Sequence, residues 1–155
     1  MPTKSEDTGS QAHAAESTTG AAGLRAEEFC EAAEAHDVDR LVTLMTEDVV
    51  FRSPAVHKPY RGRERVRVLL SAVANVMEDF RYTRKIGDPN ADEHALVFRA
   101  RIGDREVEGC DFIRVGEAGL VDELVVMVRP LSGLLALAEA MKTALELAPS
   151  LDTHG

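Results

Sequence analysis

The sequence has no tryptophan, few aromatic residues and only two cysteines. Five Phe and two Tyr occur among 155 residues, so we expect an aliphatic core in which each aromatic side chain merits separate inspection. Cys30 and Cys110 form no Cys-x-x-Cys unit, and we expect buried, reduced thiols without a disulfide. Acidic residues outnumber basic ones by 27 to 18, which argues against partners such as nucleic acid or an anionic membrane.

Long apolar runs and the motifs of several chemistries are also lacking. No stretch has the length of a membrane span, and residues 1–23 contain acids but no apolar core of a signal peptide, so we expect a soluble, cytoplasmic protein. The chain has no Walker loop, no Gly-x-Gly-x-x-Gly, no His-x-x-x-His and no Gly-x-Ser-x-Gly. We therefore expect no cofactor, no bound metal and no nucleotide.

The remaining pattern predicts one domain between two tails. Residues 1–23 are mostly Ser, Thr, Gly, Ala and charged residues, which bury too little apolar surface to fold and predict a disordered tail. The domain then covers residues 24–148, and residues 149–155 form a second tail. Apolar residues at helical spacing predict helices from Leu24, over Val38–Met45, over Arg63–Phe80 and over Leu131–Leu147.

The second half of the domain predicts a sheet. Strands are expected at Val49–Ser53, Tyr82–Ile86, His94–Ile102, Arg105–Val115 and Leu120–Val128, with Thr46–Asp48 as a turn and residues 54–62 as a loop. Short turns between the last four strands indicate antiparallel neighbours, so the fold class is α+β with the helices on one face of a curved sheet.

The other face of this sheet is predicted to be free. The last strand is apolar on both sides apart from Asp122 and Glu123, which favours a homodimer formed through the free face. The alternative is that the C-terminal helix or tail covers that face.

Six segments, in this order along the chain, carry a family resemblance. They are Ala35-His36-Asp37-Val38-Asp39, Phe51-Arg52-Ser53-Pro54, Tyr60-Arg61-Gly62-Arg63-Glu64, Glu108-Gly109-Cys110-Asp111-Phe112-Ile113, Gly119-Leu120-Val121 and Val126-Met127-Val128-Arg129-Pro130-Leu131. Over about residues 24–147 the chain resembles the nuclear transport factor 2-like superfamily, in particular its SnoaL-like branch. The resemblance implies a cone-shaped (cystatin-like) fold in which a long helix and a curved, mainly antiparallel sheet enclose a pocket.

This superfamily contains ketosteroid isomerase, polyketide cyclases, a dehydratase, an epoxide hydrolase and non-catalytic binders, so the fold leaves the activity open. Ketosteroid isomerase uses a carboxylate base, a tyrosine and a protonated carboxylic acid. The resemblance assigns these three positions to Ser53, Phe29 and Asp111. A serine hydroxyl without its own base cannot remove an α-proton at neutral pH, and a phenyl ring donates no hydrogen bond, so we do not expect steroid isomerisation by that mechanism.

The resemblance and the alternation of strand residues together predict a candidate site. The candidate catalytic residues are Asp111, His57 and Tyr60, and the candidate ligand-binding residues are Phe29, Ser53, Phe98, Ala100, Ile102, Leu124, Val126 and Val128. Asp111 is expected to lie in an apolar pocket with a raised pKa and to donate a hydrogen bond to a ligand carbonyl. The competing interpretation is a structural aspartate bonded to Ser53, Tyr60 or a backbone amide.

Two functions follow as hypotheses. One is a pocket protein that binds a hydrophobic, oxygenated small molecule, with capacity for acid–base isomerase, cyclase or dehydratase chemistry. The other is a non-catalytic dimeric binding or accessory module. Chemistry of the epoxide hydrolase type would need Asp111, Asp122 and Arg129 around one water. Alternation predicts that Asp122 faces inward with Leu124 and that Arg129 faces outward. The three side chains are therefore not expected to meet at one water.

Overall fold

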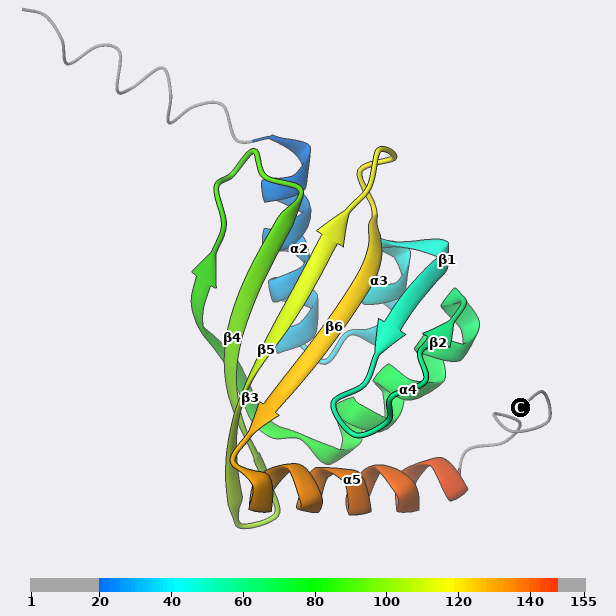
Figure 1. The fold of residues 1–155 in the computed structure, drawn as a ribbon, viewed down its shortest axis with the longest axis vertical. Helices are drawn as coiled ribbons and strands as arrows, with labels where there is room; N and C mark the ends of the chain where they lie inside the picture. The colour runs from blue at the N-terminus through cyan, green and yellow to red at the C-terminus, as the bar shows by residue number, and fades with distance from the viewer. Residues whose placement is uncertain (1–19, 148–155) are drawn as a thin grey trace, which may run out of the picture.

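The computed structural model describes residues 20–147, which fold into a curved sheet with helices packed against it (Figure 1). The helices are α2 (Ala21–Glu34), α3 (Val38–Thr43), α4 (Arg63–Val76) and α5 (Leu131–Glu146). The strands are β1 (Met45–Arg52), β2 (Tyr60–Arg61), β3 (Glu78–Ile86), β4 (Glu93–Ile102), β5 (Arg105–Val115) and β6 (Val121–Arg129).

The six strands form one sheet in the order β2-β1-β6-β5-β4-β3. Strands β3 to β6 follow one another through short turns and are antiparallel, as the turn lengths predicted. β1 lies parallel to β6 because the chain between them passes through α4 and the rest of the sheet. The α+β, mainly antiparallel fold class is therefore confirmed.

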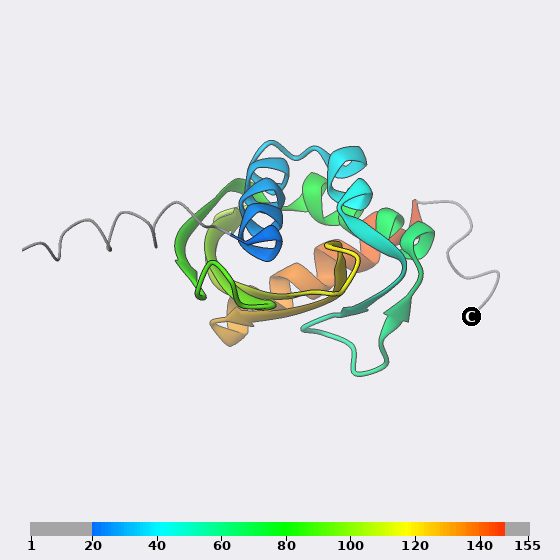
Figure 2. The ribbon, with the colours of Figure 1, turned by 90° about the horizontal axis from the view of Figure 1, so that it is seen from above.

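The helices occupy the concave side of this sheet, which Figure 2 shows from above. α2 contacts β3, β4 and β5, while α4 contacts β1 and α5. α5 crosses one end of the sheet and contacts β4, β5 and β6 (Figure 1). α5 thus covers the lower end of the sheet in the view of Figure 1.

The first helix begins earlier than the sequence predicted. Ala21 to Gly23, which the composition assigned to the disordered tail, form the first turn of α2. Ala22 and Gly23 are buried there, and the Gly23 amide donates to the Pro89 carbonyl at 3.1 Å. This tertiary contact supplies the stabilisation that composition alone does not show. Gly20 directly precedes α2 as its N-cap, and the remaining residues of the predicted tails, 1–19 and 149–155, lie outside the described residues.

The predicted helix Arg63–Phe80 is too long at its C-terminal end. α4 ends at Val76, Met77 has an extended backbone, and the next three residues belong to β3. Phe80 coincides with the helical repeat, but its ring packs against Tyr82 and Phe98 from the sheet instead. Aromatic packing therefore determines where this segment changes from helix to strand.

The first strand also differs from its prediction. Thr46–Asp48, expected as a turn, belongs to β1, which begins at Met45 opposite Val121. The register shifts between Met45 and Val50, so an irregularity in the ladder accommodates these polar residues within the strand. In the predicted loop, Tyr60 and Arg61 pair with β1 as the short strand β2.

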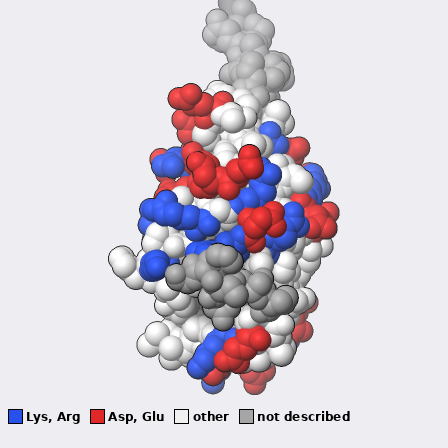
Figure 3. Space-filling view, turned by 90° about the vertical axis from the view of Figure 1, so that its right-hand side faces the viewer, with Lys and Arg blue, Asp and Glu red and all other residues white. Residues whose placement is uncertain are grey.

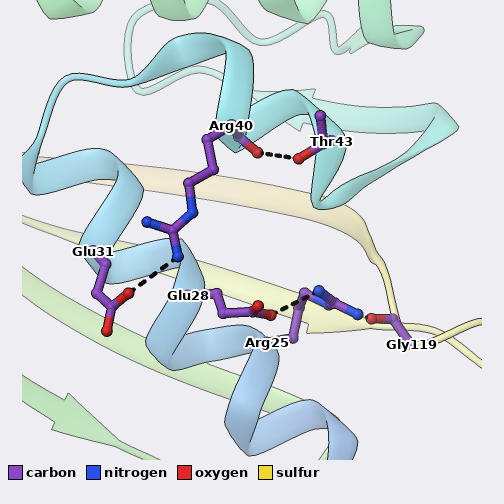
Figure 4. A network of polar contacts seen from close by, with 6 residues as sticks. All are labelled: Arg25, Glu28, Glu31, Arg40, Thr43 and Gly119. Carbon is purple, nitrogen blue, oxygen red and sulfur yellow. Dashed lines mark hydrogen bonds and ion pairs between the residues drawn. The ribbon is translucent and has the colours of Figure 1, made fainter.

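Polar contacts hold α2 and α3 in place (Figure 4). The Arg25 side chain donates to the Gly119 carbonyl in the β5–β6 turn and pairs with Glu28 at 2.7 Å. Arg40 of α3 pairs with Glu31 of α2 at 3.0 Å, which joins the two helices. These contacts fix α2 over the sheet and so position its buried residue Phe29.

Basic and acidic side chains are mixed on the face that Figure 3 shows, and neither sign forms a continuous patch among its described residues. None of the helices in residues 20–147 combines the length and the apolar character needed to cross a membrane.

Candidate functional site

A cavity of about 440 Å³ lies between the concave face of the sheet and the helices. Its wall is almost wholly apolar, and six of the seven aromatic residues line it, which are Phe29, Phe51, Tyr60, Phe80, Tyr82 and Phe98. The seventh, Phe112, is 40% exposed and belongs to the other face of β5. A volume of this size is in the range of sites that hold small organic molecules.

Asp111 is the one carboxyl group among the described residues that line the cavity. It lies in the middle of β5, between Leu96 of β4 and Val126 of β6, and only 7% of it is exposed. The Tyr82 hydroxyl donates to Asp111 Oδ2 at 2.7 Å. Among the described residues Oδ1 has no hydrogen-bond partner, so this oxygen remains available to a molecule in the cavity.

Burial changes the acidity of both members of this pair. Loss of hydration raises the pKa of Asp111 to about 7, against a smaller opposing effect of the hydrogen bond from Tyr82. Burial, and then the negative charge of Asp111, raise the pKa of Tyr82 well above its usual value. Tyr82 therefore remains a donor at neutral pH, while both the protonated and the ionised form of Asp111 are populated there.

The partner of Asp111 is none of the three that the sequence suggested. Ser53 and Tyr60 also line the cavity, but the hydrogen bond comes from Tyr82, two strands away in the sheet. Tyr82 is held by an aromatic cluster, with its ring edge-on to Phe80 at 5.0 Å between centroids. Phe80 in turn stacks on Phe98 at 4.8 Å. This cluster forms the wall that directs the phenol toward Asp111.

The structure brings most of the predicted site residues to one cavity. Those that line it are Asp111, Tyr60, Phe29, Ser53, Phe98, Leu124 and Val126. His57 does not line it and is exposed in the β1–β2 loop. The geometry therefore does not place His57 with Asp111.

Three further predicted residues lie on the correct face of the sheet but beyond the cavity. Ala100, Ile102 and Val128 pack in a second apolar cluster with Leu137 of α5. Alternation identifies the face of a strand on which a residue lies, but not its depth along the cone. Because α5 crosses this end of the sheet, these three residues contact the helix instead of the cavity.

Ser53, at the predicted base position, is not activated. Its Oγ accepts a hydrogen bond from the Ala55 amide at 3.0 Å, which forms a local turn. Within residues 20–147 it has no hydrogen bond to a histidine or a carboxylate. The hydroxyl therefore has no neighbouring base to remove its proton.

Besides Tyr82, two lining residues with ionisable side chains were absent from the predicted site, His36 and Lys142. His36 Nδ1 lies 3.1 Å from the Ala74 carbonyl oxygen, which can only accept, so Nδ1 carries a proton. The backbone of His36 is in the left-handed region, with φ 56°. In the sequence it lies between two predicted helices, and no pattern indicated that the ring lines a cavity.

Asp122 and Arg129, the other two members of the possible epoxide hydrolase-type set, lie on the outer face of the sheet. Arg129 pairs with Glu108 at 3.1 Å, as alternation predicted for an outward side chain. Asp122 pairs with Arg114 at 2.8 Å and does not share the face of Leu124. The prediction for Asp122 was wrong because the ladder is irregular between Val115 and Arg114, which interrupts the alternation in β6.

Within the part of the chain that the structure describes, no three His, Cys, Asp or Glu side chains are grouped as metal ligands. Cys30 and Cys110 are free thiols, and burial raises the pKa of Cys30 to about 12. This thiol is therefore protonated and unreactive at neutral pH.

Comparison with known proteins gives a consistent family. The model of the SnoaL-like domain matches residues 26–124. A crystal structure of a steroid delta-isomerase from Pseudomonas aeruginosa is 39% identical, with a TM-score of 0.77, and the match covers 82% of this chain and 93% of that one. A bacterial protein with a cystatin-like fold from Silicibacter pomeroyi is 30% identical, with a TM-score of 0.76, covering 80% and 86%.

A more distant likeness shows the fold alone. An NTF2-like protein from Mesorhizobium loti is 21% identical, with a TM-score of 0.62, covering 72% of this chain and 93% of that one. No curated protein matches this chain significantly.

Proposed function

This chain belongs to the SnoaL-like domain family, and from that premise we propose that its cavity binds a hydrophobic, oxygenated small molecule through Asp111. The observation that carries the proposal is the state of that carboxyl group. It is buried in an apolar wall, one oxygen accepts from Tyr82, and the other has no partner among the described residues. A ligand carbonyl or hydroxyl placed at Oδ1 would supply the missing hydrogen bond of this buried carboxyl group, so that water need not supply it.

The same carboxyl group has the properties of an acid–base catalyst. With a pKa of about 7, Asp111 exists in both protonation states at neutral pH, which suits a group that gives and takes a proton. Protonated, it donates to a ligand oxygen; ionised, it accepts a proton from a ligand carbon or hydroxyl. Isomerisation, cyclisation and dehydration all use such transfers, and the 39% identical Pseudomonas aeruginosa protein is described as a steroid delta-isomerase.

One feature favours the alternative, a binding module without catalysis. Ser53 occupies the position where ketosteroid isomerase has its carboxylate base, and its hydroxyl is already engaged by Ala55. Asp111 would then have to perform alone the work that the isomerase divides between two carboxyl groups. Binding without turnover is the expectation of this second hypothesis.

A steroid with a β,γ-unsaturated ketone separates these outcomes. Binding is measured by calorimetry, and formation of the conjugated ketone by absorbance. We expect binding, and we expect Asp111→Leu to weaken it more than Asp111→Asn, because the amide keeps a hydrogen-bond donor. Asp104→Asn, an exposed aspartate in the β4–β5 turn, is the matched control. Failure of the wild type to bind this ketone and a smaller cyclic ketone would refute the cavity proposal, while binding with no conjugated product supports the non-catalytic module.

We further infer that the outer face of the sheet joins two copies of the chain. Two apolar rows cross the middle of this face: Val97, Cys110 and Met127 are cross-strand neighbours, as are Ala95, Phe112 and Val125. Met127 is 58% exposed and Phe112 is 40% exposed. Val97 is buried, and the other members of the rows are partly exposed. Apolar rows with exposed members within a sheet are a usual feature of surfaces that associate.

The rows on either side of this apolar strip have opposite charge patterns. One row is Arg99, Glu108 and Arg129, and the other is Glu93, Arg114 and Glu123. Consider a second copy that packs its outer face against this one, related by a two-fold axis that lies between the two faces and runs perpendicular to the strands. Each charged row of one copy then lies opposite the other charged row of the second copy. Each of the three arginines in these rows therefore meets a glutamate of the second copy, so this face is complementary to itself.

Light scattering tests the dimer. We expect a dimer mass at micromolar concentration, a monomer mass for Met127→Glu, and weaker association at high salt. Leu135→Glu, which changes an equally exposed leucine on α5, should leave the dimer intact. A monomer mass for the wild type would overturn the inference.

A further inference from the structure

Lys142 is the one Lys or Arg residue among the described residues that line the cavity. It belongs to the C-terminal half of α5 and is exposed. The residues that line the cavity beside it on the same helix, Ala138, Met141 and Leu145, are all apolar. Lys142 is therefore a solvent-exposed basic residue that borders an otherwise almost wholly apolar cavity.

Acidic partners are available to Lys142 on its own helix but are not used. Glu139 lies three residues before it and Glu146 four residues after it, both at a spacing that allows an ion pair across one turn. Within residues 20–147 Lys142 forms no ion pair with either, whereas other basic residues of this domain, such as Arg25 with Glu28, pair at this spacing. Lys142 is thus a lining residue whose charge has no acidic partner among these residues.

Three other lining residues are exposed, as Lys142 is. They are His36, Ala55 and Val56. His36 uses Nδ1 for the Ala74 carbonyl, and no carboxylate belongs to this set. Among the described residues, the lining thus combines one buried carboxyl group, Asp111, with one exposed lysine, Lys142, and is otherwise almost wholly apolar.

We propose that the ligand is an apolar molecule with two polar ends, a neutral oxygen that reaches Asp111 and an anionic group, such as a carboxylate, that Lys142 binds. This inference rests on the proposed function, since it specifies the ligand class of the same cavity. An anion at Lys142 keeps its hydration on the solvent side, so its transfer from water costs little. A partly exposed ion pair of this kind contributes about two- to fivefold to affinity.

Two dyes that share one ring system test this. Anilinonaphthalene sulfonate carries an anionic group, and N-phenylnaphthylamine is the same apolar body without it. Fluorescence titration of each dye gives its dissociation constant for the wild type and for Lys142→Gln. We expect Lys142→Gln to weaken the sulfonate by about two- to fivefold and to leave the uncharged dye unchanged. The weakening should disappear at high salt.

Two further variants make the result specific. Lys58→Gln removes the same charge from the exposed β1–β2 loop, outside the cavity wall, and should change neither dye. Val126→Phe, which adds a ring to the wall beside Asp111, should weaken both dyes if they occupy the cavity.

The outcomes separate the two proposals. If both dyes bind and respond to Val126→Phe, but Lys142→Gln affects them equally or affects neither, the anionic ligand class is refuted and the cavity proposal stands. If neither dye binds, or if Val126→Phe changes neither, the cavity proposal itself fails. An equal loss of sulfonate binding in Lys58→Gln would show that general surface charge is responsible, which also overturns the assignment to Lys142.

Discussion

The ring of Phe98 lies directly over the backbone of Gly109. The two residues are paired across β4 and β5, and a Cβ atom at position 109 would lie 2.4 Å from Phe98 Cζ and 2.6 Å from the Met127 carbonyl oxygen. Phe98 can stack on Phe80 and form part of the cavity wall because Gly109 has no side chain. The absence of a side chain at Gly109 thus determines where the Phe98 ring lies in the cavity wall.

Gly109→Ala should therefore destabilise the fold by about 1–3 kcal/mol, the usual cost of overpacking, and displace Phe98 toward the cavity. Urea unfolding measures the stability. Adding Phe98→Leu should recover part of the loss, because the shorter side chain removes one of the two collisions while the Met127 carbonyl remains. An unchanged midpoint for the single variant would contradict this account.

His36 provides a test of backbone strain. With φ 56°, position 36 suits glycine better than alanine, by roughly 1 kcal/mol. Both His36→Ala and His36→Gly remove the hydrogen bond to Ala74, so their difference isolates the backbone conformation. We expect His36→Gly to be the more stable of the two in urea unfolding.

An ordinary helical position should show the reverse order. Glu139 is exposed in α5, and there Glu139→Ala should be more stable than Glu139→Gly. The same order at both positions would mean that the His36 backbone is not strained.

A helix or strand could be predicted from the sequence where its apolar residues fit only one kind of spacing. In α4, Val66, Leu69 and Leu70 are buried at helical spacing, and the helix forms where that spacing predicts it. Its end was not predictable, because Phe80 fits both the helical repeat and the strand that follows. Aromatic neighbours distant in the sequence decide between them, and local periodicity does not contain that information.

The sequence predicted which side of the sheet the site residues occupy, but it did not predict which of them contact one another. Alternation placed Asp111, Phe98 and Val126 on the concave side of the sheet, which the structure bears out. Tyr82 could not be assigned in this way, because the register between β3 and β4 shifts both before Arg81 and after Tyr82. Across such irregularities the alternation of side chains between the two faces is interrupted. The partner of Asp111 therefore required the tertiary structure.

Removal of the Tyr82 hydroxyl should raise the pKa of Asp111 above about 7. The hydrogen bond from Tyr82 stabilises the ionised carboxylate, so Tyr82→Phe leaves desolvation unopposed. Carbon-detected NMR titration of the Asp111 carboxyl measures this directly. Tyr60→Phe is the matched control, since Tyr60 also lines the cavity but has no hydrogen bond to Asp111, and it should not move the titration. A lower midpoint in Tyr82→Phe would contradict the assigned donor.

The stability of the folded chain should depend on pH through Asp111. The pKa of Asp111 is raised from 3.8 to about 7 in the folded chain, so between these values the folded state holds a proton that the unfolded state has released. The stabilisation is complete below the unfolded pKa and is lost as pH rises through the folded one. With the usual conversion of a pKa difference, its upper limit is on the order of 4 kcal/mol.

Asp111→Asn removes this titration and keeps an oxygen that can accept from Tyr82. The free energy of unfolding of the variant, relative to the wild type, should therefore increase steadily from about pH 4 to about pH 8. Urea unfolding at several pH values measures both curves, and Asp104→Asn controls for loss of an exposed charge. A difference between wild type and Asp111→Asn that stays constant with pH would show that Asp111 titrates alike in both states. In that case the buried carboxyl would be ionised throughout this range, and it could not donate a hydrogen bond to a ligand oxygen.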